Sequence, residues 1–153
     1  MRVLYVALLL LLAMPLKAES LQQVLSLKEP PAGVVFEILA PSQSSWQQIQ
    51  PQLLSAIEQL RQRFPGVDVA VVSHGNEQFA LLTKNRGMFA SLHQGVLDLG
   101  AQGVDVHVCG TYASWRDIKP DEFPEYVDVS ASGPAQINDY KAIGYLLVED
   151  FAF

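Results

Sequence analysis

Residues 103–110 read Gly103-Val104-Asp105-Val106-His107-Val108-Cys109-Gly110 and hold the clearest strand signal in the chain. From residue 104 to residue 108 valine alternates with a polar residue, which predicts a strand with one apolar and one polar face. Residues 111–116, directly after Cys109 and Gly110, are predicted to form a helix with Thr111 as its N-cap. A strand that passes directly into a helix indicates an α/β protein.

The same alternation of strands and helices extends over the rest of the chain. Further strands are predicted at residues 34–39, 67–72, 127–129 and 145–148, helices at residues 46–64, 88–99 and 134–143, and a short helical turn within 77–84. Ser45 and Gln48 resemble a capping box, whereas Pro51 predicts a kink or a later start of the first long helix. This order predicts a flavodoxin-like three-layer α/β sandwich with a mostly parallel sheet of about five strands.

An apolar N-terminal segment indicates export. Residues 3–14 form an apolar run that follows Arg2 and precedes a short stretch ending in Ala18, which is the layout of a signal peptide. The run is shorter than the roughly 20 residues that cross a bilayer, so an uncleaved anchor is the less favoured alternative. We expect residues 1–18 to be removed and residues 19–153 to form one periplasmic or secreted domain without a stable membrane span.

The balance of charge argues against nucleic-acid ligands. The 153-residue chain has 10 basic and 16 acidic residues, and removal of residues 1–18 takes away Arg2 and Lys17 but no acid. An acidic chain repels phosphate backbones, and no basic cluster offsets this repulsion. The carboxylates at residues 121–122 and 149–150 are expected to be solvated loop and terminal charges.

The single cysteine, Cys109, is the strongest candidate for a chemical role. One thiol excludes an internal disulfide framework and the dithiol exchange of a C-x-x-C motif. Burial as a small hydrophobic side chain is the usual state of a free cysteine, and it stays open as an alternative. The predicted place at a strand end and a helix start favours the thiolate, which is the nucleophilic form. We therefore expect Cys109 to be the catalytic residue if the protein has an activity.

Several polar residues are expected beside Cys109. His74 and Gly75 follow the second predicted strand, and the carboxyl ends of parallel strands are where such sheets bind ligands. Asp105 and His107 share the polar strand face with Cys109, either as an orienting carboxylate and a Cys–His pair or as solvated residues. The predicted binding residues are His74, Gly75, His107, Gly110 and Thr111. No metal or cofactor is predicted, because no pair of candidate ligands has a recognised metal spacing.

Taken together, these motifs resemble the DsrE/DsrF-like family. The matching features are Ser73-His74-Gly75 after a strand, the segment 103–110, and Ser132-Gly133-Pro134-Ala135 leading into a helix before Gly144-Tyr145. The resemblance covers residues 34–148 and implies a flavodoxin-like parallel sheet and assembly into oligomers. In sulfur-relay members of the family, a cysteine at the corresponding strand end carries a persulfide between partner proteins. The resemblance implies this role for Cys109, although those relay members work in the cytoplasm and this chain is expected to be exported.

Two functions follow as hypotheses. In the first, the Cys109 thiolate attacks a sulfane sulfur, holds it as a persulfide and passes it on, while His74 and His107 position the sulfur. Its partners are then a sulfane-sulfur donor or acceptor. In the second, the chain is a non-catalytic module for small-ligand binding or oligomeric assembly, and Cys109 is structural. A homo-oligomer is expected in either case.

Overall fold

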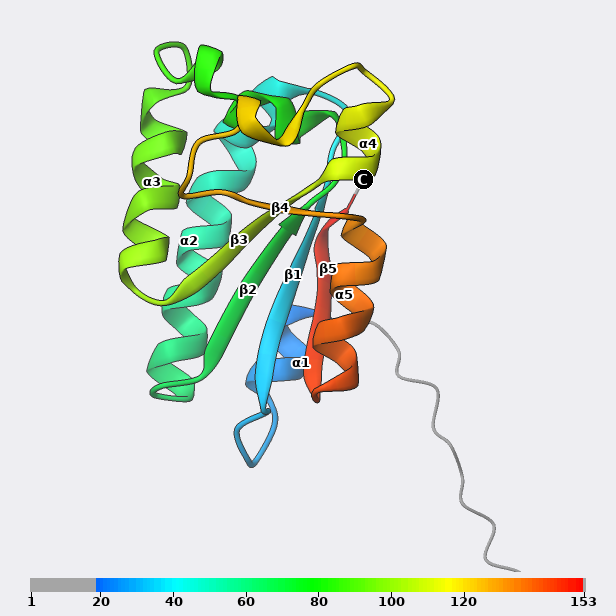
Figure 1. Cartoon of the computed structure of the whole chain (residues 1–153). Coiled ribbons are helices and arrows are strands. Elements are labelled where there is room, and N and C mark those ends of the chain that lie inside the picture. Colours follow the sequence, from blue (N-terminus) through cyan, green and yellow to red (C-terminus); the bar gives the residue numbers. More distant parts are fainter. Residues whose placement is uncertain (1–18, 153) are drawn as a thin grey trace, which may run out of the picture.

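The computed structural model describes residues 19–152 and contains one parallel β-sheet (Figure 1). Its strands are β1 (Gly33–Leu39), β2 (Asp68–Ser73), β3 (Val104–Cys109), β4 (Asp128–Ser130) and β5 (Tyr145–Ala152). They lie in the order β4-β3-β2-β1-β5, and every neighbouring pair is parallel. The predicted α/β, flavodoxin-like fold class with a five-stranded sheet is therefore confirmed.

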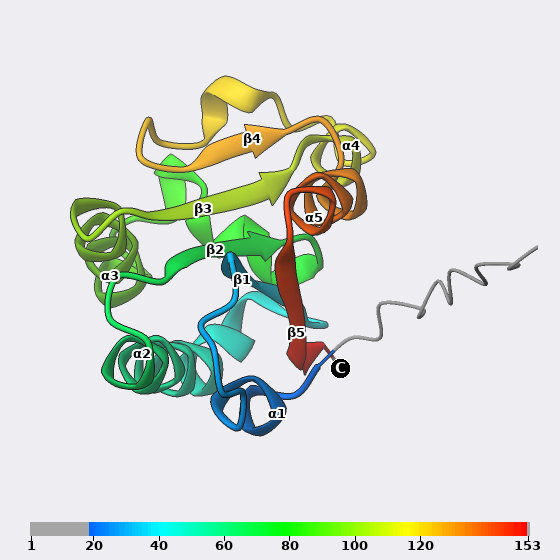
Figure 2. The same ribbon diagram turned by 90° about the horizontal axis from the view of Figure 1, so that it is seen from below.

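Helices cover both faces of the sheet, with more helices on one face than on the other. The α-helices are α1 (Leu21–Leu25), α2 (Trp46–Arg63), α3 (Ala90–Ala101), α4 (Gly110–Ser114) and α5 (Gly133–Ala142). Four 3-10 helices are η1 (Gln43–Ser45), η2 (Asn76–Leu81), η3 (Thr83–Asn85) and η4 (Pro120–Glu122). Figure 2 shows α1, α2 and α3 on one face and α5 on the other. The short α4 lies at the carboxyl end of the strands (Figure 1).

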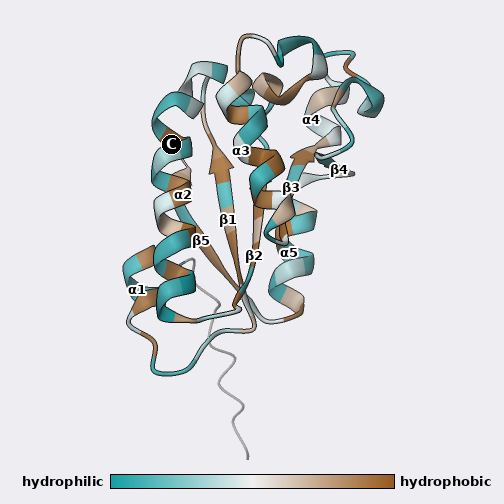
Figure 3. Cartoon of the chain, turned by 90° about the vertical axis from the view of Figure 1, so that its left-hand side faces the viewer, coloured by the Kyte–Doolittle hydropathy of each residue, from teal (hydrophilic) through white to brown (hydrophobic). Residues whose placement is uncertain are grey.

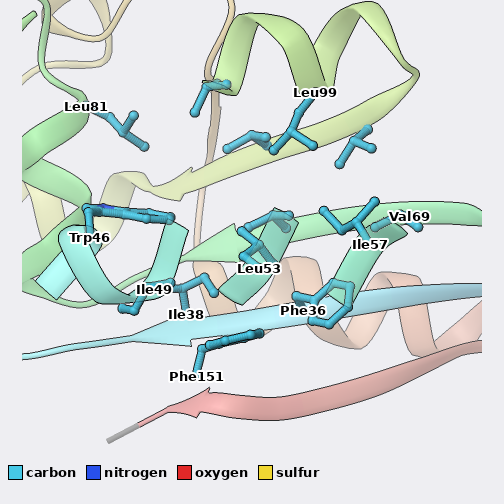
Figure 4. Close-up of a cluster of buried hydrophobic side chains, with 14 of the residues drawn as sticks. Phe36, Ile38, Trp46, Ile49, Leu53, Ile57, Val69, Leu81, Leu99 and Phe151 are labelled. Atoms are coloured by element: carbon cyan, nitrogen blue, oxygen red, sulfur yellow. The ribbon is translucent and has the colours of Figure 1, made fainter. Parts of the chain in front are cut away.

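The larger core lies between the sheet and helices α2 and α3. In Figure 4 the buried side chains of α2 point at the strands, and Phe36 of β1 lies beside Phe151 of β5 with ring centroids 6.0 Å apart. Each fully buried aliphatic or aromatic side chain of this kind stabilises the fold by about 1.5–3 kcal/mol relative to exposure. Figure 3 shows the strands mainly in the hydrophobic colour and much of the outer surface of the helices in the hydrophilic one.

The face under α5 has a smaller core and more polar groups. Its buried apolar cluster consists of Val35, Ala70, Val72, Ile137, Tyr140 and Leu147. Along β1, β2 and β3, this is the face that carries Glu37, His74, His107 and Cys109, because side chains alternate along each strand. One helix covers this polar face, and the functional candidates lie there.

The first long helix begins at Trp46, as its periodicity predicts, and not later at Pro51. Helix α2 starts at Trp46 and runs through Pro51 without a break. The predicted later start was wrong because η1 leads directly into α2, and Pro51 removes a single backbone hydrogen bond close to the helix start. The predicted capping box was also wrong: Ser45 makes no side-chain cap bond and instead lies 3.1 Å from the Ser42 hydroxyl.

Strand β5 is longer than predicted and includes two acidic residues that follow the predicted strand end. Glu149 and Asp150 are exposed, as expected for solvated charges, and they lie inside the strand. The register between β1 and β5 shifts between Phe36 and Ile38, so both acids lie opposite Glu37 in a bulge. Asp150 accepts a hydrogen bond from the Leu21 backbone N–H at 2.9 Å. The bulge thus turns one acid toward α1 and leaves Glu149 beside Glu37.

The expected signal peptide, residues 1–18, lies outside the described residues. Within residues 19–152, no helix has the length and apolar character required to cross a membrane. The first described residue, Glu19, already belongs to the fold, because its backbone N–H donates to Leu147 O at 2.8 Å.

Candidate functional site

A row of four polar side chains crosses the carboxyl ends of four neighbouring strands on the α5 face. Cys109 is the last residue of β3, and His74 follows the last residue of β2. Because Ser73 pairs with Val108, the next residues along the two strands, His74 and Cys109, lie side by side. Glu37 of β1 and Glu149 of β5 continue the row beyond His74. The sequence-based expectation that His74 lies near Cys109 agrees with this geometry.

Glu37 and His74 form a hydrogen-bonded pair of a carboxyl group and an imidazole. The His74 Nε2 atom is 2.7 Å from Glu37 Oε1, and the two side chains are only 11% and 14% exposed, respectively. The hydrogen bond to His74 lowers the pKa of Glu37, and this outweighs the opposing effect of burial. Burial, and then the neighbouring Glu37 carboxyl, raises the pKa of Glu149. Glu37 therefore ionises at lower pH than Glu149 and is the partner of His74.

Sequence reasoning did not identify Glu37 or Glu149 as site residues. A signal was present for Glu37, because it is the only charged residue in the apolar strand Gly33–Leu39 and stands two residues from its end. No comparable signal marked Glu149. Its position depends on the bulge in β5, which arises from the register of two strands far apart in the sequence.

Cys109 is buried, with 5% of its surface exposed. Its Sγ atom accepts a hydrogen bond from the Tyr112 backbone N–H at 3.4 Å, and its own backbone N–H donates to Gln78 Oε1 at 2.7 Å. Cys109 itself is the N-cap of α4, so the prediction of Thr111 as N-cap was wrong. Thr111 is exposed, and its hydroxyl donates to Ala131 O at 2.6 Å. The helix begins at Gly110, one residue earlier than predicted, so the N-cap position falls on Cys109.

The start of α5 covers the pair of Cys109 and His74. A Cβ atom on Gly133 would lie 2.5 Å from His74 Cβ and 3.4 Å from Cys109 Cβ, so glycine is required for this close approach. Two predicted binding residues lie in similarly tight surroundings: a Cβ on Gly110 would lie 2.9 Å from Ser130 O, and one on Gly75 would lie 2.7 Å from Ala40 O. Each of these glycines thus lets two backbone segments meet beside the row.

His107 lies on the same face and contacts other residues. Its Nε2 atom is 2.8 Å from the Tyr140 hydroxyl and its Nδ1 atom 3.0 Å from the Ser130 hydroxyl. Asp105 is reached through Tyr140, whose hydroxyl donates to Asp105 Oδ2 at 3.3 Å. Burial lowers the pKa of His107, against the opposing effects of Asp128 and Asp105. Within residues 19–152 no hydrogen bond joins His107 or His74 to the Cys109 sulfur, and His107 instead ties α5 to β3 and β4.

The described residues contain no group of three or more His, Cys, Asp or Glu side chains arranged to hold a metal ion. A cavity of about 520 Å³ lies elsewhere, between the starts of α2 and α3. Its lining is mostly apolar and includes Trp46, Leu54, Met88 and Phe89, and Cys109 is not part of it. Cys109 and this cavity are therefore separate features.

Comparisons with known proteins give structural matches. Neither a family model nor a curated protein sequence matches the chain. The solved structure of MTH1491, a protein of unknown function from Methanobacterium thermoautotrophicum, is 22% identical with a TM-score of 0.63, covering 76% of this chain and 96% of its own. The ychN protein of E. coli is 18% identical with a TM-score of 0.56, covering 75% of this chain and 97% of its own.

Both neighbours belong to the DsrE-like fold family, and this chain is similar to them in fold. At these identities the DsrE-like match concerns the fold, and activity is a separate question. The matches span nearly the whole of both neighbours. The resemblance read from the sequence is thus supported at the level of the fold.

Proposed function

We propose that this chain is an exported DsrE-like protein that carries a sulfane sulfur as a persulfide on Cys109. The observation that carries the proposal is the row formed by Cys109, His74 and Glu37 at the carboxyl ends of three adjacent strands. A nucleophile, an imidazole and a carboxylate in this order are the groups needed to accept and hold the proton of a thiol. The DsrE-like fold supports the same reading.

The chemistry needs one proton transfer and one displacement. The Cys109 thiol loses its proton to the His74 imidazole, and the Glu37 carboxylate stabilises the imidazolium through the 2.7 Å contact. The thiolate then attacks the outer, sulfane sulfur of thiosulfate. A bond forms between Sγ and that sulfur, the original sulfur–sulfur bond breaks, and its electron pair leaves with sulfite. The product is a Cys109 persulfide anion, and transfer to an acceptor thiolate repeats the displacement on the persulfide.

Two elements cover the thiol and must move for a donor to reach it. They are the first turn of α4, which carries the Tyr112 N–H, and the start of α5 at Gly133. Both lie at the same end of the sheet (Figure 1). We propose that loading of Cys109 occurs in a minor state in which one of them has opened, as is common for lids over reactive groups.

Intact-mass spectrometry tests the proposal. The mature chain is exposed briefly to thiosulfate or polysulfide beside a Cys109→Ala variant. We expect a mass gain of about 32 Da per sulfur atom that thiol reverses and that the variant lacks. A wild-type chain that gains no sulfur, while a thiol reagent still titrates Cys109 after unfolding, contradicts the proposal.

Burial of Cys109 favours a second candidate, a non-catalytic module for ligand binding or assembly. In that case the thiol packs as a small apolar group, and the cavity between α2 and α3 is the place for a ligand. Cys109→Ser then leaves the oligomeric state and any ligand binding unchanged. The rate of alkylation of folded Cys109 separates the candidates, because the sulfur carrier requires an opening of α4 or α5 that exposes the thiol in the folded protein, and a purely structural thiol requires none. Homo-oligomers and export are part of both proposals.

A further inference from the structure

Gln78 contacts the proposed sulfur site from below the first turn of α4. It is fully buried, and its Oε1 atom accepts the Cys109 backbone N–H at 2.7 Å. Its neighbours in η2 hold the same turn of α4: the Tyr112 hydroxyl donates to Asn76 at 2.8 Å, and the Phe79 and Tyr112 rings lie 5.5 Å apart. The carboxamide of Gln78 is thus enclosed between η2, Cys109 and α4.

The other end of this carboxamide has no partner. Within residues 19–152, Gln78 Nε2 is the one buried side-chain nitrogen or oxygen without a hydrogen bond. The orientation of the amide is fixed, because turning it over would place an N–H₂ group against the Cys109 N–H, donor against donor. A buried donor left unpaired costs free energy, so its presence beside the thiol requires an explanation.

The backbone around Gln78 is held firmly, so relaxation of the loop does not remove the unpaired group. The buried carboxylate of Glu77 accepts hydrogen bonds from Ala40 N, Ser73 Oγ and Gly75 N at 2.7, 2.7 and 3.0 Å. Trp46 Nε1 donates to the Glu77 carbonyl at 3.0 Å. These bonds hold the segment from Ser73 to Glu77 in one conformation and place Gln78 against Cys109.

We propose that Gln78 Nε2 donates a hydrogen bond to the sulfane sulfur that Cys109 carries. The inference rests on the proposed function and adds to it the group that recognises the bound sulfur anion. The terminal sulfur of a persulfide lies about 2.05 Å from Sγ and bears the negative charge, so it is the acceptor that a neutral amide N–H₂ group can stabilise. Tyr112 N–H contacts Sγ itself, and Gln78 supplies the donor for the added atom.

The test compares persulfide lifetimes in the mature chain of residues 19–153. The chain is loaded with polysulfide, the excess is removed, and intact mass is followed with time. Gln78→Glu keeps an oxygen for the Cys109 N–H and replaces the Nε2 donor by a second oxygen. Gln52→Glu makes the same chemical change at an exposed position of α2 and is the matched control. We expect Gln78→Glu to shorten the persulfide lifetime about tenfold, as for loss of one hydrogen bond to a charged group, and the control to leave it unchanged.

A second measurement does not depend on the folding of a variant. In wild-type protein labelled with 15N-glutamine, the side-chain N–H₂ signal with a nuclear Overhauser effect to the Cys109 amide belongs to Gln78. We expect this signal to shift on sulfur loading and to return on reduction with thiol.

The outcomes separate the two ideas. An unchanged lifetime in Gln78→Glu, or an unchanged N–H₂ signal in loaded wild-type protein, overturns the role of Gln78 and leaves the sulfur carrier intact. Wild-type protein that takes up no sulfur overturns the sulfur carrier and this inference with it.

Discussion

Glu37 is an acidic residue in an otherwise apolar strand, and His74 is the reason that it is stable there. The 2.7 Å contact satisfies both side chains on a face that α5 largely covers. A buried carboxylate without such a partner is costly, so the two residues depend on each other. The proposed chemistry uses this imidazole as the group that accepts the proton of the Cys109 thiol.

Replacement of Glu37 by glutamine is expected to slow reaction at Cys109. The amide is neutral, so the His74 imidazolium that forms with the thiolate loses its counter-charge. Hydrogen bonds to charged groups contribute about 1.5–3 kcal/mol, and partial exposure reduces this, so we expect alkylation by iodoacetamide near neutral pH to slow about threefold to tenfold. Glu58→Gln makes the same chemical change at an exposed position of α2 and is the control. Equal rates in Glu37→Gln and wild type would contradict a role of the pair in the reaction.

Residue patterns predicted Cys109 at the strand end and His74 beside it, because parallel strands bring their carboxyl ends to one edge. The partner of His74 could not be predicted, since Glu37 lies on another strand and the sequence does not state which strands are adjacent. The burial of Cys109 could not be predicted from the sequence either. It depends on Gly133, which is 24 positions later in the numbering and packs over the thiol from the start of α5.

At the scale of elements, α5 is held to the sheet by polar contacts as well as by packing. Tyr140 of α5 contacts His107 and Asp105 of β3, and the Ser130 hydroxyl of β4 lies 3.0 Å from both His107 Nδ1 and Gln136 Oε1 of α5. Burial, followed by Asp105, raises the pKa of Tyr140, which keeps its hydroxyl protonated and able to donate. The same helix begins over Cys109, so these contacts also position the cover of the thiol.

Loss of the Tyr140 hydroxyl is expected to loosen α5. Tyr140→Phe leaves His107 Nε2 buried without its partner, which costs about 1–3 kcal/mol of unfolding free energy. Urea denaturation measures that loss, and hydrogen exchange of the α5 amides measures its location. Tyr145→Phe is the matched control, because the Tyr145 ring packs on Tyr140 and its hydroxyl is in no hydrogen bond within residues 19–152. A loss of stability no greater than in the control would show that the polar contacts do not hold α5.

Element types and order were predicted well because the hydrophobic periodicities are clear. Strands β1, β2 and β3 and helices α2, α3 and α5 lie close to their expected ranges. The errors occur where neighbouring structure overrides the preference of the local sequence. A 3-10 turn starts α2 ahead of Pro51, and pairing with β1 carries β5 past Val148 to Ala152. Helix α1 was not predicted, because its five residues are too few to show a helical periodicity.

For the whole molecule, each edge of the sheet is short or protected. Strand β4 has three residues, and the β5 edge carries a bulge with two acids and pairs with Glu19. Such edges discourage strand-to-strand aggregation, so the expected homo-oligomer requires another surface. Met88, Trp115 and Ile143 are the most exposed large apolar side chains among the described residues. The oligomeric state itself stays a prediction.

Stability of the whole domain is expected to fall in mild acid. Burial lowers the pKa of both His93 and His107 below the ordinary value of 6.5, so the folded state prefers their neutral forms. The stability that follows is fully present above pH 6.5 and is lost as pH falls through the lowered values, because the unfolded chain then binds more protons. Glu37 adds a loss of the same sign from pH 4.5 downward, whereas Glu149 acts in the opposite sense.

Urea denaturation between about pH 8 and about pH 5.5 measures this dependence, above the range in which most carboxyl groups titrate. We expect the unfolding free energy to decrease toward the acid end and the decrease to be smaller in His107→Gln, which cannot be protonated. The glutamine variant is less stable at neutral pH because the contacts with Tyr140 and Ser130 change, so the slope with pH, and not the absolute value, is compared. A wild-type protein that gains stability between pH 8 and pH 5.5, or a variant with the full wild-type slope, would show that His107 is not held neutral in the fold.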